Sequence, residues 1–211
     1  MKRTEIDIPL STVSLKGELV IPEHAIGIVI FSHGSGSSRS SPRNRAVAEL
    51  IQQHGIGTFL FDLLTEPEDA IYENRFNIDL LASRLIQATE WIKQSKDSSG
   101  LPIGYFGAST GAASALRAAA YFEKEVKAVV SRGGRPDLAL NVLHLVTAPT
   151  LLIVGQLDVP VIKINKEAFD ELKTIKEMKI IPGATHLFEE PGKLMEVAKL
   201  AISWYLEYLK K

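Results

Sequence analysis

Residues 103–111 read IGYFGASTG, and the alanine-rich run AASALRAAAYF follows at 112–122. The first four residues are typical of a short buried strand, and the alanine-rich run is typical of a helix. Between them, Gly107, Ser109 and Gly111 match the pattern G-x-S-x-G, which needs a sharp strand-to-helix turn to present a serine nucleophile. Glycines on either side of the serine leave room for the neighbouring strand and helix. We therefore expect Ser109 to be a nucleophile; a turn that serves only close packing is the alternative.

The rest of the chain alternates between short apolar runs and helical patterns. Strands are expected at 16–21, 26–31, 58–61, 102–106, 126–131, 150–154 and 178–181, and helices at 42–54, 73–94, 110–122, 191–209 and near 137–143 and 161–173. Continuously apolar strands separated by helices predict βαβ units and a mostly parallel sheet covered by helices on both faces. Because no repeat or long linker interrupts the alternation, we expect residues 1–211 to form a single α/β domain.

The composition excludes several classes of function. The chain of 211 residues has 24 Lys and Arg, 25 Asp and Glu, and no cysteine. The resulting charge of −1 offers no basic excess to a phosphate backbone, so no nucleic-acid partner is expected. Without cysteine there is no disulfide, thiolate metal site or cysteine nucleophile. The first residues lack the apolar core of a signal peptide, and no apolar run approaches the ~18 residues that span a bilayer. We expect a cytoplasmic protein with no membrane partner, no cofactor and no metal.

A serine hydroxyl is a weak nucleophile until a base takes its proton, and the chain has five histidines that could do so. His186 lies in the loop after the last expected strand, at the edge where parallel sheets place their sites. His33 also ends a strand, but it precedes the serine in the chain. The other three are assigned to a hairpin turn (His24), a helix end (His54) and a helix or its end (His144). His186 is therefore the preferred base.

An acidic residue is expected to orient that histidine. Asp158 follows the strand at 150–154 and lies between Ser109 and His186, in the chain order Ser…Asp…His. Asp137 and Asp170 lie in the same interval and are interpreted as a helix-start residue and a solvated helix residue. Asp158 is preferred over both, with a turn-forming role as its alternative.

Residues 32–41, SHGSGSSRSS, have the composition of a flexible linker but stand between an expected strand and helix. Small residues in such a turn let a backbone amide approach an oxyanion. We expect the Thr110 N–H to be one oxyanion donor and the Ser35 N–H to be the other, with Gly36 as the alternative. A phosphate-binding P-loop does not fit because no Gly-Lys-Ser/Thr follows. A dinucleotide fingerprint does not fit because Arg39 replaces its third glycine.

Taken together, the motifs at 31–36, 107–111, 155–158 and 183–186 resemble the α/β-hydrolase superfamily, and more narrowly its small dienelactone-hydrolase-like members. The resemblance covers nearly the whole chain. It implies an α/β-hydrolase fold and a Ser109–His186–Asp158 triad that acts on a small ester or lactone. Dienelactone hydrolases proper carry a cysteine nucleophile, so Ser109 favours a serine carboxylesterase. No interval could hold a large lid domain; residues 63–75 are expected to form a solvated acidic loop, with a pocket rim as the alternative.

Three arginines could select an anionic substrate. Arg132 follows an expected strand, and Arg39 and Arg43 lie in or near the oxyanion loop. Bidentate recognition of a carboxylate suits arginine, whereas a surface or bracing role is the simpler interpretation. The leading hypothesis is hydrolysis of short-acyl esters. The alternatives are a non-catalytic ligand-binding module on the same fold, and an acyltransferase or perhydrolase with the same triad. The sequence leaves open whether the protein is a monomer or a homodimer.

Overall fold

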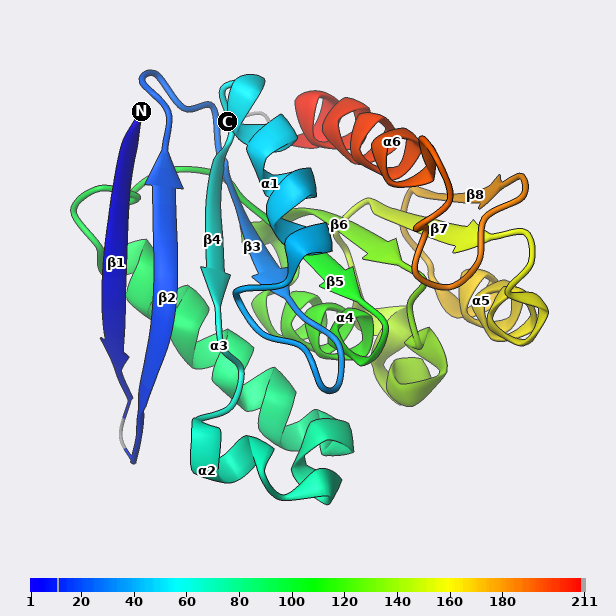
Figure 1. The fold of residues 1–211 in the computed structure, drawn as a ribbon, viewed down its shortest axis with the longest axis horizontal. Coiled ribbons are helices and arrows are strands. Elements are labelled where there is room, and N and C mark those ends of the chain that lie inside the picture. Colours follow the sequence, from blue (N-terminus) through cyan, green and yellow to red (C-terminus); the bar gives the residue numbers. More distant parts are fainter. Residues whose placement is uncertain (11, 210–211) are drawn as a thin grey trace.

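The computed structural model describes residues 1–10 and 12–209, whose eight strands form a single sheet (Figure 1). The order across the sheet is β1-β2-β4-β3-β5-β6-β7-β8. From β4 to β8 all neighbours are parallel, while β1 and β2 are antiparallel additions at one edge. The strands are β1 (Lys2–Pro9), β2 (Ser14–Ile21), β3 (Ile28–Ser32), β4 (Gly57–Phe61), β5 (Ile103–Ala108), β6 (Val126–Arg132), β7 (Thr150–Gly155) and β8 (Lys176–Ile181).

Helices cover both faces of the sheet, as predicted (Figure 1). One face carries α1 (Pro42–Gln53) and α6 (Lys193–Tyr208), which pack against each other. The opposite face carries α3 (Ile78–Gln94), α4 (Thr110–Phe122), η3 (Pro136–Leu145) and α5 (Val159–Glu171). The short elements α2 (Glu66–Asp69), η1 (Tyr72–Phe76) and η2 (Glu123–Glu125) complete the chain.

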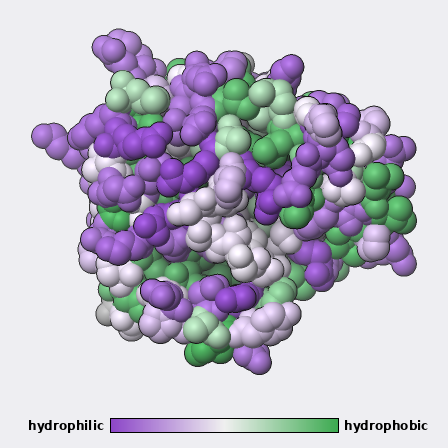
Figure 2. All heavy atoms as spheres, in the orientation of Figure 1, coloured by the Kyte–Doolittle hydropathy of each residue, from purple (hydrophilic) through white to green (hydrophobic). Residues whose placement is uncertain are grey.

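Each strand in the middle of the sheet contributes to two apolar clusters, because successive side chains point to opposite faces. Val129 belongs to the cluster beneath α3 and α4, and its neighbour Val130 belongs to the cluster beneath α1 and α6. All residues of β3, β4, β5 and β7 are buried. Outside this core, the face seen in Figure 2 is mainly hydrophilic, with several small and separate apolar patches.

Two expectations about the elements were wrong. His24 does not lie in a hairpin, because β4 lies between β2 and β3 in the sheet. The helix expected at 73–94 begins only at Ile78, where the Asn77 side chain accepts a hydrogen bond from the Leu80 N–H and caps it. The segment expected to be helical near 137–143 lies within the 3-10 helix η3. Strand β1 was not predicted, since its alternating charged residues suit an exposed edge and give no apolar run.

Within the described residues, no helix is both long and apolar enough to cross a bilayer. In the same part of the chain, no group of three or more His, Cys, Asp or Glu side chains is arranged to hold a metal ion.

Candidate active site

Ser109 lies in the sharp turn between β5 and α4, with φ of 52° and ψ of −122°. This left-handed backbone region is rare for residues other than glycine, and such strain is concentrated at functional sites. The glycines around it are needed for close packing. A Cβ on Gly107 would lie 2.4 Å from the Cα of Ala112, and a Cβ on Gly111 would lie 2.1 Å from the carbonyl oxygen of Ser32. The turn has the geometry that the G-x-S-x-G pattern predicts.

His186 and Asp158 contact each other in the loops after β8 and β7, at the carboxyl ends of the parallel strands, where Ser109 follows β5. The Nδ1 of His186 lies 2.6 Å from Oδ2 of Asp158. Asp158 stands directly before α5 but makes no capping hydrogen bond to it, so its carboxylate is available to the imidazole. The carboxylate is mostly buried, whereas the His186 side chain is 38% exposed. With Nδ1–H donating to the carboxylate, Nε2 is left as the basic nitrogen.

The loop after β6 contacts both the serine turn and the histidine. The Ser109 N–H donates to the Arg132 carbonyl oxygen at 3.2 Å, and a Cβ on Gly133 would lie 3.5 Å from the Nδ1 of His186. In the part of the chain that is described, the Ser109 hydroxyl makes no hydrogen bond to His186. Catalytic hydrogen bonds are often long before substrate binds, so the arrangement remains compatible with proton transfer.

The loop after β3 also packs on the nucleophile. A Cβ on Gly34 would lie 3.0 Å from the Cβ of Ser109. The Ser35 N–H, predicted as an oxyanion donor, donates instead to the Thr110 Oγ1 at 2.9 Å. Among the described residues, the Gly36 N–H makes no hydrogen bond, and Gly36 has a positive φ of 65° that favours glycine. The predicted loop is therefore in place, but the Ser35 amide is already engaged.

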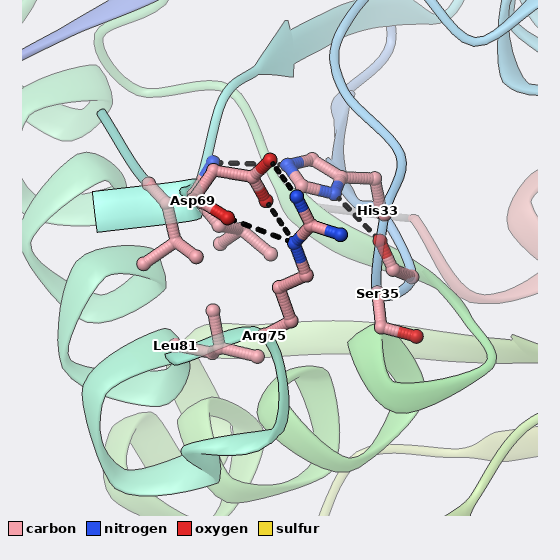
Figure 3. A pocket seen from close by; sticks show the side chains of 9 residues that line it. His33, Ser35, Asp69, Arg75 and Leu81 are labelled. Carbon is pink, nitrogen blue, oxygen red and sulfur yellow. Dashed lines mark hydrogen bonds and ion pairs between the residues drawn. The ribbon is translucent and has the colours of Figure 1, made fainter. Parts of the chain in front are cut away.

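His33 holds this loop through hydrogen bonds of both its ring nitrogens (Figure 3). Its Nδ1 donates to the Gly34 carbonyl oxygen at 3.0 Å, and its Nε2 accepts from the Leu63 N–H at 3.0 Å. These two bonds require a neutral ring. Burial lowers the pKa of His33, which keeps the ring neutral. The histidine thus ties the end of β3 to the segment after β4.

The segment around α2 and η1 lines a small hollow beside the loop (Figure 3). The hollow measures about 10 Å³, close to the space that one water molecule needs. Arg75 makes two hydrogen bonds to the Asp69 carboxylate, at 3.1 and 2.8 Å, and both residues line the hollow with His33 and Ser35. The acidic residues Glu66 and Glu73 are exposed, as expected of a solvated segment, whereas Asp69 is paired with Arg75 and lines the hollow. No sequence motif marked Arg75.

The three candidate arginines have different surroundings. Arg39 pairs with Asp62 through both its guanidinium and its backbone N–H, which favours a bracing role. Arg43 pairs with Glu189 at 2.5 Å. Arg132 is buried, and its hydrogen bond to Asn44 is long, at 3.5 Å. Burial and the positive charge of Arg43 lower the pKa of Arg132 to about 10. Asn44 was not singled out in the sequence.

The remaining candidates lie in structural or exposed positions. Asp137 pairs with Arg135 at 2.8 Å, and Asp170 is exposed on α5. His54 caps the end of α1 and bonds the Leu50 carbonyl oxygen at 2.8 Å, as predicted. His24 and His144 are exposed.

Known proteins share this architecture. Residues 17–210 match the model of the dienelactone hydrolase family. The crystal structure of dienelactone hydrolase from Anabaena variabilis ATCC 29413 is 55% identical, with a TM-score of 0.96 over 99% of both chains. Est1E from Butyrivibrio proteoclasticus, solved with ferulic acid bound, superposes with a TM-score of 0.84 over 98% of this chain and 100% of that chain. At 17% sequence identity, this similarity shows only that the two proteins share a fold. The expected α/β-hydrolase fold is confirmed.

Two curated relatives come from Mycobacterium tuberculosis, strains CDC 1551 / Oshkosh and ATCC 25618 / H37Rv. Each is 52% identical over 209 residues, which is 99% of this chain, and each is named "Putative phosphoribosyl transferase". The match covers 47% of either relative, so the chain spans about half the length of these proteins.

Proposed function

This chain belongs to the dienelactone hydrolase family, and from that premise we propose that it cleaves small carboxylic esters or lactones through Ser109, His186 and Asp158. The observation that carries the proposal is the 2.6 Å contact between His186 Nδ1 and Asp158 Oδ2, at the sheet edge where a strained turn exposes Ser109. Such a carboxylate fixes the tautomer of the imidazole and stabilises its protonated form. Family membership makes the chain a hydrolase; the serine mechanism and the ester substrate are the proposal.

In the proposed reaction, Ser109 Oγ attacks the ester carbonyl while His186 Nε2 takes its proton. The tetrahedral intermediate collapses to an acyl-serine, and the alcohol leaves with the proton from His186. Water, activated by the same histidine, then releases the acid. The Thr110 N–H at the start of α4 and one amide of the loop after β3 hold the oxyanion. Within residues 1–10 and 12–209, the Gly36 amide has no hydrogen-bond partner, whereas the Ser35 amide must be shared with Thr110 Oγ1.

The surroundings of the pair favour a small, partly apolar substrate. Leu157 and Val159 flank Asp158 and are 60% and 67% exposed, and Leu187 follows His186 and is 38% exposed. Apolar side chains in these positions can cover an acyl group. The α2–η1 segment is a rim and is far too short for a lid domain.

Phosphoribosyl transfer, in the name of the M. tuberculosis relatives, is not proposed for this chain. The chain matches about half of those proteins. The loops at the carboxyl ends of its strands carry Ser109, Asp158 and His186, residue types that suit acyl transfer.

The proposal is tested with a fluorescent fluorophosphonate, which reacts with an activated serine. We expect one label per chain on Ser109, none on the Ser109→Ala variant, and hydrolysis of 4-nitrophenyl esters of short acids by the unmodified protein only. Asp158→Asn should lower kcat by on the order of 10²–10⁴, because the neutral amide no longer stabilises the imidazolium and its NH₂ group favours the wrong imidazole tautomer. Asp170→Asn, on the exposed side of α5, is the matched control and should leave kcat within about twofold.

Absence of label on Ser109 together with absence of ester turnover would overturn the proposal. Two related functions give different results in the same assay. A binding module would hold a ligand with equal affinity in the Ser109→Ala variant and release no product. An acyltransferase or perhydrolase would give a new ester or a peracid when alcohol or peroxide is added.

A further inference from the structure

His186 lies in a turn, residues 185–190, that is closed by hydrogen bonds to the Glu190 side chain. The Oε1 of Glu190 accepts the Thr185 N–H at 3.1 Å and the Thr185 hydroxyl at 2.5 Å. Thr185 directly precedes His186, so the carboxylate holds the neighbour of the residue that carries the imidazole. The carbonyl oxygen of Glu190 accepts the Lys193 N–H at 3.0 Å, at the start of α6. The far end of the turn is therefore anchored to a helix.

The backbone of this turn is strained and needs such a closure. Phe188, two residues after His186, has a φ of 58°, which is costly for a bulky residue. Its ring is fully buried in the cluster beneath α1 and α6, which fixes one side of the turn. Its N–H reaches the Thr185 carbonyl oxygen at 3.3 Å, a long hydrogen bond. Because hydrogen bonds to a charged acceptor are stronger, the Glu190 carboxylate is the main polar link across the turn.

Few other contacts fix the His186 ring. In the described chain its one side-chain hydrogen bond goes to Asp158 at 2.6 Å, and 38% of the side chain is exposed. Asp158 is held on a different loop, where its N–H donates to the Gly155 carbonyl oxygen at 3.1 Å. The distance between the two side chains therefore depends on how the turn 185–190 is held. Displacing a reacting group by about 1 Å can lower a rate by about 100-fold.

We propose that Glu190 is a positioning residue for His186. By closing the turn 185–190 on Thr185, it keeps the imidazole in contact with Asp158. This role rests on the proposed function, because it concerns the same triad, and Glu190 acts through the turn rather than on the substrate. Hydrogen bonds from Thr185 lower the pKa of Glu190, so the accepting group is a carboxylate at neutral pH. Glutamine could accept the same two hydrogen bonds through its amide oxygen, whereas alanine could accept neither.

A kinetic test compares Glu190→Ala and Glu190→Gln with Glu189→Ala as the matched control. Glu189 is the neighbouring carboxylate, but it pairs with Arg43. With 4-nitrophenyl butyrate, Glu190→Ala should lower kcat on the order of 10-fold at nearly unchanged KM, because a displaced imidazole affects proton transfer and not ester binding. Glu190→Gln and Glu189→Ala should stay within about threefold. A kcat of Glu190→Ala within about threefold of the unmodified protein, or an equal loss in either other variant, would overturn the proposal.

The ring tautomer of His186 gives a second readout that needs no turnover. In protein labelled with ¹⁵N-histidine, the ring nitrogen shifts distinguish the Nδ1–H form of a neutral imidazole from the Nε2–H form, and His186→Gln assigns the signals. We expect the Nδ1–H form alone in the unmodified protein and in Glu190→Gln. Glu190→Ala should give a mixture of both forms, since its ring is no longer held against Asp158.

The same spectra separate positioning from a purely structural role. If Glu190→Ala keeps the Nδ1–H form alone and only melts at a lower temperature, Glu190 merely stabilises the fold and the proposal is wrong. A mixture of tautomers already present in the unmodified protein would also contradict it. Failure of the proposed function has a different signature, namely no fluorophosphonate label on Ser109 and no ester turnover in the unmodified protein. The tautomer comparison still decides the role of Glu190 in that case.

Discussion

At the residue scale, two histidines at strand ends have opposite roles because their surroundings differ. His186 is partly exposed and has a carboxylate at 2.6 Å, which suits a group that gains and loses a proton. His33 is buried between a backbone acceptor and a backbone donor, which suits a ring that stays neutral. Both follow a strand in the sequence, so their positions alone did not separate them. The chain order Ser…Asp…His favoured His186.

The burial of His33 predicts a loss of stability in acid. Its folded-state pKa lies below the usual 6.5, so between the two values the unfolded chain binds a proton that the folded chain does not. The stability that comes from burying His33 as a neutral ring is fully present above about pH 6.5. It is lost as the pH falls, and the free energy of unfolding drops by up to about 1.4 kcal/mol per pH unit. Urea unfolding of the unmodified protein and of His33→Gln at pH 7.5 and 5.0 measures this effect. The free energy of unfolding should fall more between the two pH values in the unmodified protein, because the amide of glutamine can replace both hydrogen bonds without titrating. Equal losses would contradict this assignment.

At the element scale, β5, the Ser109 turn and α4 act as one unit that requires glycine at two places. The start of α4 packs against the end of β3 so closely that a Cβ on Gly111 would lie 2.1 Å from the Ser32 carbonyl oxygen. Buried hydroxyl groups reinforce this contact, since Ser114 bonds Ser32 at 2.7 Å. The close approach brings the loop after β3 onto Ser109, which is where an oxyanion donor is needed.

Replacing Gly111 by alanine should therefore cost far more stability than an equivalent change elsewhere. We expect Gly111→Ala to lower the free energy of unfolding by about 3 kcal/mol or more, because backbone atoms on both sides must move. Gly100→Ala is the control. It meets no atom within 4 Å but has a φ of 78°, so only the left-handed penalty of about 1–2 kcal/mol applies. Urea unfolding of both variants measures the difference, and a Gly111→Ala loss no larger than that of Gly100→Ala would show that the contact relaxes easily.

At the scale of the whole molecule, the two faces of the sheet share the same strands. Trp91 on α3 packs against the cluster on one face, and Trp204 on α6 belongs to the cluster on the other. Adjacent strand residues such as Val129 and Val130 support opposite clusters. Loss of either helical layer would expose strands that hold the other layer, so the layers should not unfold separately.

Two single-tryptophan variants test this coupling. Trp91→Phe leaves Trp204 as the reporter, and Trp204→Phe leaves Trp91. In each variant, the urea midpoint from tryptophan fluorescence should coincide with the midpoint from far-UV circular dichroism, as expected of a single cooperative transition. A fluorescence midpoint that clearly precedes the circular-dichroism midpoint in either variant would mean that one layer melts before the other.

The strands and helices of the parallel part of the sheet were predictable because their signals are local. Apolar runs, alanine-rich stretches and the glycines around Ser109 stand within a few residues of each other. Strand β1 and the insertion of β4 between β2 and β3 were not predictable in this way. Pairing between distant strands depends on which strand edges remain free after the core forms. The residues of one strand do not identify the strand with which it will pair.

For this protein, the sequence by itself determined the α/β class, the serine turn and the order of Ser109, Asp158 and His186, because each depends on neighbours along the chain. Tertiary structure alone decided which groups meet across the fold. It joined His186 to Asp158, engaged the Ser35 amide with Thr110 and paired Arg39 with Asp62. It also buried Arg132, whose Nε has no hydrogen-bond partner among the described residues. Burial and pairing are properties of three-dimensional surroundings, and the same arginine in a sequence can be a brace or a binding group until those surroundings are known.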